Sequence, residues 1–189
     1  FTDQATPRRC LGIRGPRLES NSGIDPGSTL QHRNIVRVVH LFPPNASFHV
    51  LMEYVPGMPL SALRETFPWE QEQALALAQQ VLSALEKLEN EQILHGDLSL
   101  NNLLWDGETV HLIDFGSAVL RDKNKPIPAA TLAYCAPEVE RGNEPPRTAD
   151  LYALGVILYE LLSGMSPFER DANGVMQKHR LRSHAAIPD

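Results

Sequence analysis

Residues 93–116 read I-L-H-G-D-L-S-L-N-N-L-L-W-D-G-E-T-V-H-L-I-D-F-G, and the rest of the chain is organised around this stretch. It contains two short apolar runs, residues 103–105 and 110–113, with Asp106-Gly107 between them. Because Asp-Gly between strand-like runs is a strong hairpin signal, the sequence predicts two antiparallel strands. A hairpin folded about residue 108 places Asn102 opposite Asp114, at the separation of about 5 Å that paired residues have.

Polar residues around this hairpin indicate a site for phosphoryl transfer. The amide oxygen of Asn102 and the carboxylate of Asp114 are hard ligands at one end of the two strands. Such oxygens suit Mg²⁺, which usually takes one or two carboxylates together with phosphate oxygens. Asp97 precedes the hairpin on a loop, where its carboxylate can face a substrate.

The bulk composition is that of an ordinary soluble globular protein. The chain has 189 residues, of which 42% are hydrophobic and 21% charged. The net charge of −6 argues against nucleic acid as a partner. The longest apolar run, residues 151–162, contains Glu160 and is too short to span a bilayer, so no membrane segment is expected. Two cysteines, Cys10 and Cys135, make no disulfide framework, which favours a reducing, cytoplasmic location.

The first half of the chain is interpreted from turn residues and periodicity. Residues 1–30, rich in Gly, Pro, Ser and Arg, are expected to form an irregular arm. Residues 35–42 and 48–54 are predicted to be two strands of a hairpin, and residues 60–67 a short helix. A long helix is predicted from residue 69 to residue 90, with one buried face that comprises Ala74, Ala78, Val81, Leu85 and Leu88.

The second half is expected to contain two further helices. Residues 151–162 are apolar nearly all round, which is typical of a buried central helix. Thr148 is expected to cap that helix, and Gly164 to end it. Residues 175–184 look helical and basic.

Several ordered motifs resemble those of the protein kinase family, over roughly residues 30–189. His95-Gly96-Asp97 with Asn102 resembles the catalytic loop, and Asp114-Phe115-Gly116 resembles the magnesium-binding motif. The Ala-Pro-Glu at residues 136–138 resembles the motif that closes the activation segment, and residues 150–155 resemble the start of the helix that anchors the catalytic loop. Residues 52–55, Met-Glu-Tyr-Val, resemble the hinge that holds adenine, and residues 32–36 the lead-in to the fourth strand.

The resemblance implies an α+β, protein-kinase-like fold with a mostly helical large lobe and a truncated or degenerate β small lobe. Residues 31–189 would form a partial kinase domain. Within it, residues 31–55 would be the end of the small lobe and the hinge, and residues 56–189 the large lobe. The implied function is phosphorylation of protein substrates in signalling, with ATP and Mg²⁺ as cofactors.

The family's site residues carry over by motif. Asp97 would accept or orient the proton of the attacking hydroxyl, and Asn102 and Asp114 would hold Mg²⁺ across the ATP phosphates. Asp150 would hydrogen-bond the backbone of the catalytic loop, and His95 would pack under Phe115. The remaining residues implied at the nucleotide and at Asp97 are Met52, Glu53 and Val55 at the hinge, Leu104 beneath adenine, and Thr131, which would bond Asp97.

The chain departs from the family's pattern at two positions of the catalytic loop. Gly96 stands where many protein kinases carry an Arg that pairs with an activation-loop phosphate, and residues 121–130 contain no Ser, Thr or Tyr. Regulation without phosphorylation of that segment is therefore expected. Ser99 stands where serine/threonine kinases usually carry a Lys that touches the transferred phosphate, so weaker stabilisation of the transition state is expected. The position of Thr131, three residues before Tyr134, favours serine/threonine specificity.

A third departure concerns the nucleotide. Kinases use a strand Lys and a Gly-rich loop on the ATP phosphates, but the first Lys of this chain is Lys87, inside the long helix, and no such loop precedes it. Three functions remain open: a serine/threonine protein kinase present as a partial domain, a pseudokinase that binds a partner protein or nucleotide, and a small-molecule phosphotransferase of the aminoglycoside or choline type. The Ala-Pro-Glu motif and the Asp150 helix argue against the last, and the Asp97, Asn102 and Asp114 set favours the first.

Overall fold

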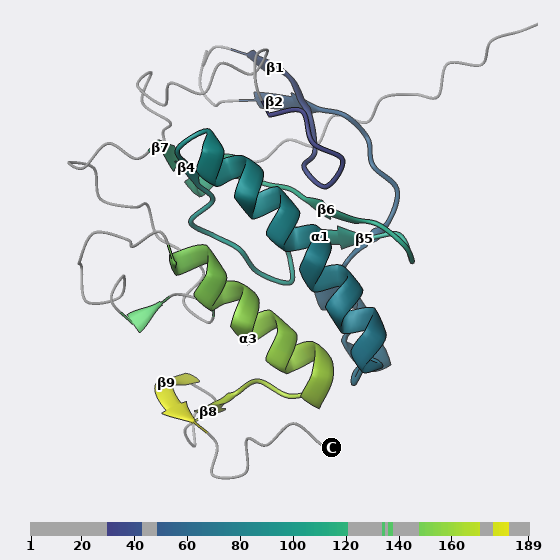
Figure 1. Ribbon diagram of the computed structural model, residues 1–189, viewed down its shortest axis with the longest axis vertical. Coiled ribbons are helices and arrows are strands. Elements are labelled where there is room, and N and C mark those ends of the chain that lie inside the picture. Colours follow the sequence, from purple (N-terminus) through teal and green to yellow (C-terminus); the bar gives the residue numbers. More distant parts are fainter. Residues whose placement is uncertain are drawn as a thin grey trace, which may run out of the picture.

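The computed structural model describes residues 30–42, 49–120, 134, 136–137, 148–170 and 176–181, which form an α+β arrangement. Two long helices, α1 (Gln71–Asn90) and α3 (Ala149–Ser163), pack side by side and run in opposite directions (Figure 1). The described residues also form the 3₁₀ helices η1 (Leu60–Thr66) and η2 (Phe115–Ser117). The strands pair antiparallel in small sheets: β1 (Val38–Phe42) with β2 (His49–Met52); β5 (Leu103–Trp105) between β3 (Met58–Pro59) and β6 (Val110–Leu112); β4 (Ile93–Leu94) with β7 (Val119–Leu120); and β8 (Phe168–Arg170) with β9 (Met176–Leu181).

Helix α1 buries the face that its periodicity predicts. Ala74, Ala78, Val81, Leu85 and Leu88 all lie in the core, whereas Leu75 and Leu82 on the opposite side are exposed. The helix begins at Gln71, two residues later than expected, because the backbone of Glu70 is still extended, with φ of −61° and ψ of 144°. Just before it, the backbone N–H of Trp69 donates to the carbonyl of Leu161 in α3 at 2.7 Å. That bond ties the start of α1 to the end of α3.

The predicted hairpin is present as β5 and β6, but its register differs by one residue from the expected one. Leu103 pairs with Leu112 and Trp105 with Val110, so Asn102 lies opposite Ile113 and not opposite Asp114. The turn causes this shift, because Asp106 Oδ1 accepts hydrogen bonds from the N–H groups of both Glu108 and Thr109. These bonds fix a turn whose centre lies before residue 108.

Helix α3 confirms the predicted central helix in its position and its end. Gly164 has φ of 72° and ends the helix in the left-handed conformation that glycine favours. Thr148 is the N-cap residue and Asp150 lies in the first turn, as expected, but the Thr148 side chain makes no capping hydrogen bond. The Asp150 carboxylate accepts from the backbone of the loop after β4. Contrary to expectation, the helix is not buried all round, because Leu151 is 46% exposed.

The end of the chain folds differently from the prediction. Residues 176–181 form β9, which pairs with β8, and not a helix over residues 175–184. Short helices are marginal in water, so the pairing partner decides the conformation of so short a segment. Residue 175 and residues 182–184 lie outside the described part of the chain.

The strand predicted over residues 35–42 is shorter, because its first part runs along the β5–β6 hairpin. Ile35 forms a parallel bridge with Leu112, and β1 starts only at Val38. The buried Asn34 side chain fixes this segment, since its Nδ2 donates to Gln80 Oε1 of α1 and to the Val110 carbonyl of β6, both at 2.8 Å. The residues before β1 are therefore attached to the helix and to the hairpin together.

Gly57, which precedes β3, allows the chain to approach β5 closely. Its φ is +118°, and a Cβ there would lie 2.7 Å from the Trp105 carbonyl oxygen. We expect Gly57→Ala to lower the free energy of unfolding by about 1–3 kcal/mol because of this strain and clash. In contrast, Gly155→Ala in α3 meets no atom within 4 Å and should stabilise the helix by up to about 1 kcal/mol. Urea denaturation of both variants checks the pair, and equal effects would contradict the strain at Gly57.

Within the described ranges, the structure contains no helix that is both long and apolar enough to cross a membrane.

Candidate active site

The loop between β4 and β5 is held by a carboxylate from α3. Asp150 is 6% exposed, and its two oxygens accept hydrogen bonds from the backbone N–H groups of His95 at 2.9 Å and Gly96 at 3.0 Å. This confirms the expected role of Asp150. Because Asp150 is fixed in the first turn of a core helix, the loop that carries Asp97 has a fixed position too.

His95 connects the same loop to the residues that follow β6. Its ring is fully buried, lies edge-on to the Phe115 ring with centroids 5.0 Å apart, and has Nε2 3.1 Å from the Ile113 carbonyl oxygen. This packing confirms the expectation that His95 lies under Phe115. The contact places the Asp114-Phe115-Gly116 segment beside the loop of Asp97.

Asp97 and Asn102 are in direct contact. The Asn102 Nδ2 donates to the Asp97 carbonyl at 2.8 Å and to Asp97 Oδ2 at 3.1 Å. Asn102 is 7% exposed, and its backbone carbonyl accepts from the Ile113 N–H at 3.0 Å. The amide therefore orients the carboxylate of Asp97, and Asn102 is itself fixed by the end of the hairpin.

Asp114 has an unusual backbone conformation beside this pair. Its φ and ψ are 62° and 82°, and its Oδ1 accepts from the Gly116 N–H at 3.0 Å. Among the described residues, no group donates to Asp114 Oδ2 or to Asn102 Oδ1, and the Asn102 side chain forms hydrogen bonds through its Nδ2 alone. These two oxygens are hard ligands, and they fit Mg²⁺, which commonly takes few protein ligands.

The described residues contain no group of three or more His, Cys, Asp or Glu side chains that could hold a metal ion. A site of one amide and one carboxylate differs from such a group, because phosphate and water oxygens complete the coordination of Mg²⁺.

The hinge residues lie where β2 leads into β3. Met52 ends β2, and the Glu53 N–H donates to the Arg37 carbonyl at 2.9 Å. No described residue bonds to the Glu53 carbonyl or to the Val55 N–H. Leu104 is half-buried in β5, between Pro59 and His111. A carbonyl and an N–H two residues apart can bind the edge of a purine.

Ser99 is a buried polar residue close to Asp97. It is 1% exposed, and among the described residues its Oγ has no hydrogen-bond partner. Thr131 and the Glu of the Ala-Pro-Glu motif lie outside the described residues, as do residues 121–130.

Sequence reasoning missed a buried polar cluster that joins η1, α3 and Tyr134. Glu160 of α3 accepts hydrogen bonds at Oε2 from Arg64 of η1 at 2.8 Å and from the Tyr134 hydroxyl at 3.1 Å. Burial, followed by the charge of Glu160, raises the pKa of the Tyr134 phenol well above its usual value, so it stays protonated and donates. A lone Glu in an apolar run was the available signal, but its partners are distant in sequence.

Comparison with known proteins finds relatives that are all described as protein kinases. The protein kinase domain family matches residues 22–188. The serine/threonine-protein kinase TIO of Arabidopsis thaliana is 33% identical over 164 residues, which are 85% of this chain and 12% of that protein. The serine/threonine-protein kinase PrkC of Bacillus subtilis is 32% identical over 176 residues, which are 88% of this chain and 26% of that protein. The serine/threonine-protein kinase pkn3 of Myxococcus xanthus is 34% identical over 168 residues, which are 80% of this chain and 31% of that protein.

The match agrees with the geometry of the described site, in which Asp97, Asn102 and the Asp114 segment lie around one buried loop. The chain spans less than a third of the length of each of these relatives. Since the family match covers most of the 189 residues, the α+β arrangement described above is a kinase-like fold, and the chain belongs to the protein kinase domain family.

Proposed function

We propose that this chain transfers the γ-phosphoryl group of ATP to serine or threonine hydroxyls of protein substrates, with Asp97 as the base. The observation that carries the proposal is that Asn102 Nδ2 donates hydrogen bonds to both the backbone carbonyl and the side-chain carboxylate of Asp97. A carboxylate held in this way can accept the proton of an attacking hydroxyl. The serine/threonine kinase relatives support the same class of reaction.

The chain's own residues would position the reactants. Asp150 holds the loop through two backbone N–H groups, so that the Asp97 carboxylate has a fixed place. Asn102 Oδ1 and Asp114 would hold Mg²⁺, which when bound neutralises charge on the phosphate oxygens. The Glu53 carbonyl and the Val55 N–H would bind adenine, with Met52 and Leu104 on its faces.

Ser99 and Thr131 determine the expected rate of phosphoryl transfer and the expected type of acceptor hydroxyl. Ser99 brings a neutral hydroxyl to a position where the family usually has Lys, so less transition-state charge is stabilised and a slow rate is expected. Thr131, by its spacing before Tyr134, supports a serine or threonine acceptor. Mg²⁺ and ATP are the proposed cofactors, and a protein is the proposed substrate.

The identity of the phosphorylated residue tests this function. The chain is incubated with Mg²⁺, γ-labelled ATP and a generic protein substrate, and the labelled residues are identified by mass spectrometry. We expect label on serine or threonine and its loss when EDTA removes the metal. Label on tyrosine alone would overturn the acceptor assignment. Label on an aminoglycoside or choline in parallel assays, without any on protein, would assign the chain to small-molecule phosphotransfer.

A non-catalytic binding module is the second candidate. It is favoured because residues 1–86 contain no Lys that could bind the ATP phosphates. Lys87 is the first Lys of the chain, and its Nζ lies 2.7 Å from Glu91 Oε1 in the last turn of α1. That Lys is therefore engaged in an ion pair on the helix. Binding of Mg²⁺-ATP at one equivalent without any transfer of phosphate would support this candidate over the enzyme.

A further inference from the structure

The outer edge of β6 is closed by the segment that precedes β1. β6 is the last strand in the order β3-β5-β6, so among the described strands none pairs with its outer edge. There the Leu112 N–H donates to the Asn34 carbonyl at 2.8 Å, and the Leu112 carbonyl accepts from the Val36 N–H at 2.9 Å. Because Leu112 lies two residues before Asp114, these bonds hold the strand that leads to a proposed metal ligand.

Two amide side chains, Gln80 and Asn34, close the rest of this edge, and we refer to them as the amide bracket. Gln80 Oε1 of α1 accepts from the Val110 N–H at 3.0 Å and from Asn34 Nδ2 at 2.8 Å. Asn34 Nδ2 also donates to the Val110 carbonyl, and Gln80 Nε2 donates to the Glu108 carbonyl, both at 2.8 Å. Val110 and Asn34 are buried, so loss of a partner leaves polar groups there at a high cost.

The segment held by the amide bracket also contacts the hinge through its backbone. Val36 bonds to Leu112 of β6, and the carbonyl of the next residue, Arg37, accepts from the Glu53 N–H at 2.9 Å. Two consecutive residues therefore connect the hinge to the strand that precedes Asp114. Glu53 and Asp114 are proposed to bind the adenine and the metal ends of one nucleotide. A ligand can use both ends together only when their separation is correct.

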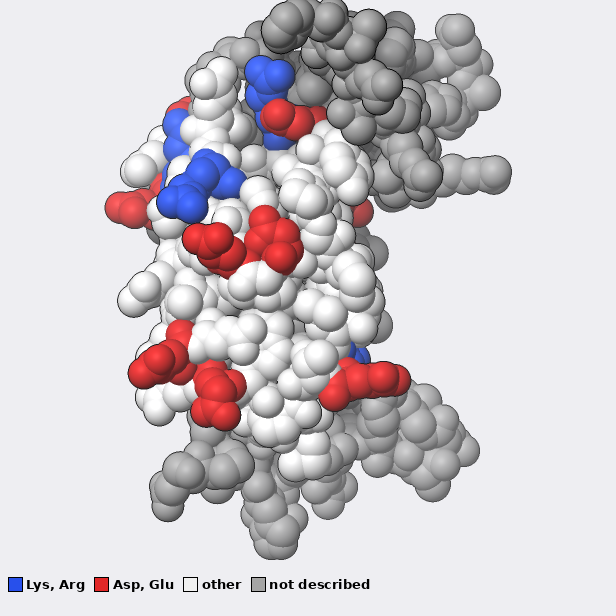
Figure 2. Space-filling view, turned by 90° about the vertical axis from the view of Figure 1, so that its right-hand side faces the viewer, with Lys and Arg blue, Asp and Glu red and all other residues white. Residues whose placement is uncertain are grey.

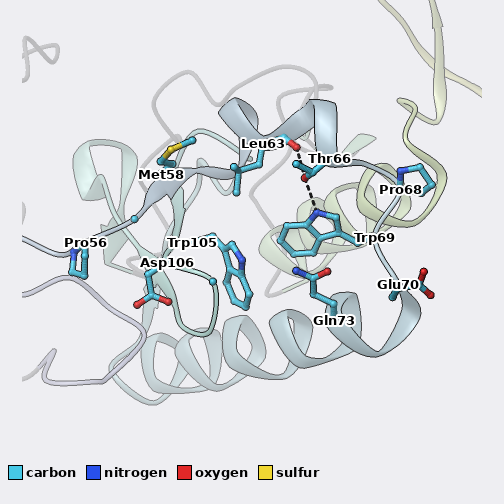
Figure 3. A pocket seen from close by; sticks show the side chains of 12 residues that line it. Pro56, Met58, Leu63, Thr66, Pro68, Trp69, Glu70, Gln73, Trp105 and Asp106 are labelled. Carbon is cyan, nitrogen blue, oxygen red and sulfur yellow. Dashed lines mark hydrogen bonds between the residues drawn. The ribbon is translucent and has the colours of Figure 1, made fainter.

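The β5–β6 hairpin is fixed separately at its turn end (Figure 3). Trp105 of β5 packs against Trp69, with ring centroids 5.5 Å apart. The Trp69 indole N–H donates to Thr66 Oγ1 at 3.0 Å, drawn as a dashed line in Figure 3. The hairpin is therefore a firm support, and the amide bracket fixes the hinge-side segment to it.

Exposed charges provide a weaker connection between the same parts. Arg37 Nε lies 3.5 Å from Glu53 Oε2, but both side chains are 57% exposed. Figure 2 shows one face of the molecule, on which Lys and Arg gather near the top while Asp and Glu extend over the described surface below. Charges on such a surface interact weakly, because solvent and salt screen them. The amide bracket is thus the stronger determinant of the position of the hinge-side segment.

We propose that Gln80 and Asn34 are positioning residues for the nucleotide, which hold the hinge and the metal-binding end of β6 at the separation that one Mg²⁺-ATP requires. The proposal rests on the function proposed above, because it concerns the same adenine and metal contacts. Both side chains act through the backbone of β6 and of residues 34–37. Loss of the bracket should therefore change how well the two ends of ATP bind together, and not how adenine binds alone.

Calorimetric titration with adenosine and with Mg²⁺-ATP tests this separation. Adenosine needs the hinge alone, whereas Mg²⁺-ATP needs the hinge and the metal end together. Gln80→Ala should weaken Mg²⁺-ATP binding at least about tenfold, a difference of about 1.4 kcal/mol, and leave adenosine binding unchanged. Gln80→Glu keeps oxygens that can accept from Asn34 and Val110, so it should retain most of the affinity for Mg²⁺-ATP. Partial unfolding of a variant would lower the number of binding sites for both ligands equally, and not the ratio of the two affinities.

Two control variants localise the effect. Gln79→Ala removes the neighbouring amide, which is exposed on α1, and should leave both affinities unchanged. Arg37→Gln removes the exposed ion pair and should also leave them unchanged. Equal weakening of both ligands by Gln80→Ala would overturn the proposal, as would a loss of Mg²⁺-ATP affinity in Gln79→Ala of the same size.

The parent chain distinguishes failure of this inference from failure of the proposed function. If the parent chain binds Mg²⁺-ATP more tightly than adenosine and Gln80→Ala retains that difference, the positioning role is wrong and the metal site stands. If the parent chain binds Mg²⁺-ATP no more tightly than adenosine, the proposed metal site is wrong, and the positioning role is overturned with it.

Discussion

Replacement of Asp97 by Asn is expected to slow phosphoryl transfer by about 10²–10⁴-fold, the usual contribution of a positioned acid or base. The substitution keeps the shape of the side chain and removes its ability to accept a proton. Asn102 can still donate to the oxygen of the new amide, as it does to Asp97 Oδ2 at 3.1 Å. The loss therefore affects the chemical step and not the fold of the loop.

Two controls separate chemistry from folding. Mg²⁺-ATP affinity and the thermal midpoint of Asp97→Asn should equal those of the parent chain, because Asp97 is not among the groups expected to hold nucleotide. Glu72→Gln, an exposed carboxylate in the first turn of α1, should leave the transfer rate unchanged. A parental transfer rate in Asp97→Asn would show that another group accepts the proton.

Asp150→Ala is expected to have the largest effect on stability among the site residues. Its carboxylate is buried and accepts from the N–H groups of His95 and Gly96. Loss of two charge-assisted bonds lowers the free energy of unfolding by about 3 kcal/mol, because the two donors remain without acceptors. Since domains are stable by only about 5–15 kcal/mol, this is a large fraction of the total.

Asp150→Asn is the graded control for this prediction. It keeps one oxygen that can accept from a single N–H, so roughly half of the destabilisation, about 1.5 kcal/mol, is expected. Urea denaturation measures both variants, and the transfer rate should fall in the same order as the loop loses its support. If Asp150→Ala unfolds at the same urea concentration as the parent chain, the loop is held by other contacts.

The hairpin and the long helix were predictable because their signals are local. The Asp106-Gly107 pair lies directly between two apolar runs, and the buried face of α1 repeats with helical spacing. The register was wrong by one residue because hydrogen bonds from the Asp106 side chain determine where the turn closes. Turn closure depends on this side-chain geometry, which the apolar pattern does not encode.

The parts that sequence reasoning missed depend on distant partners. β9 pairs with β8, and a basic segment that looks helical by itself becomes a strand there. Arg64 and Glu160 are 96 positions apart, yet their side chains form the buried cluster with Tyr134. Short-range periodicity carries no information on either pairing.

Single-turnover transfer from γ-labelled ATP tests the central claim most directly, with the chain in excess over nucleotide and a protein acceptor present. The chain and Asp97→Asn are compared after Mg²⁺-ATP binding has been measured on the same samples. The account predicts equal binding by both and label on serine or threonine for the parent chain only. Equal binding with no transfer by either protein would contradict catalysis and leave a nucleotide-binding module.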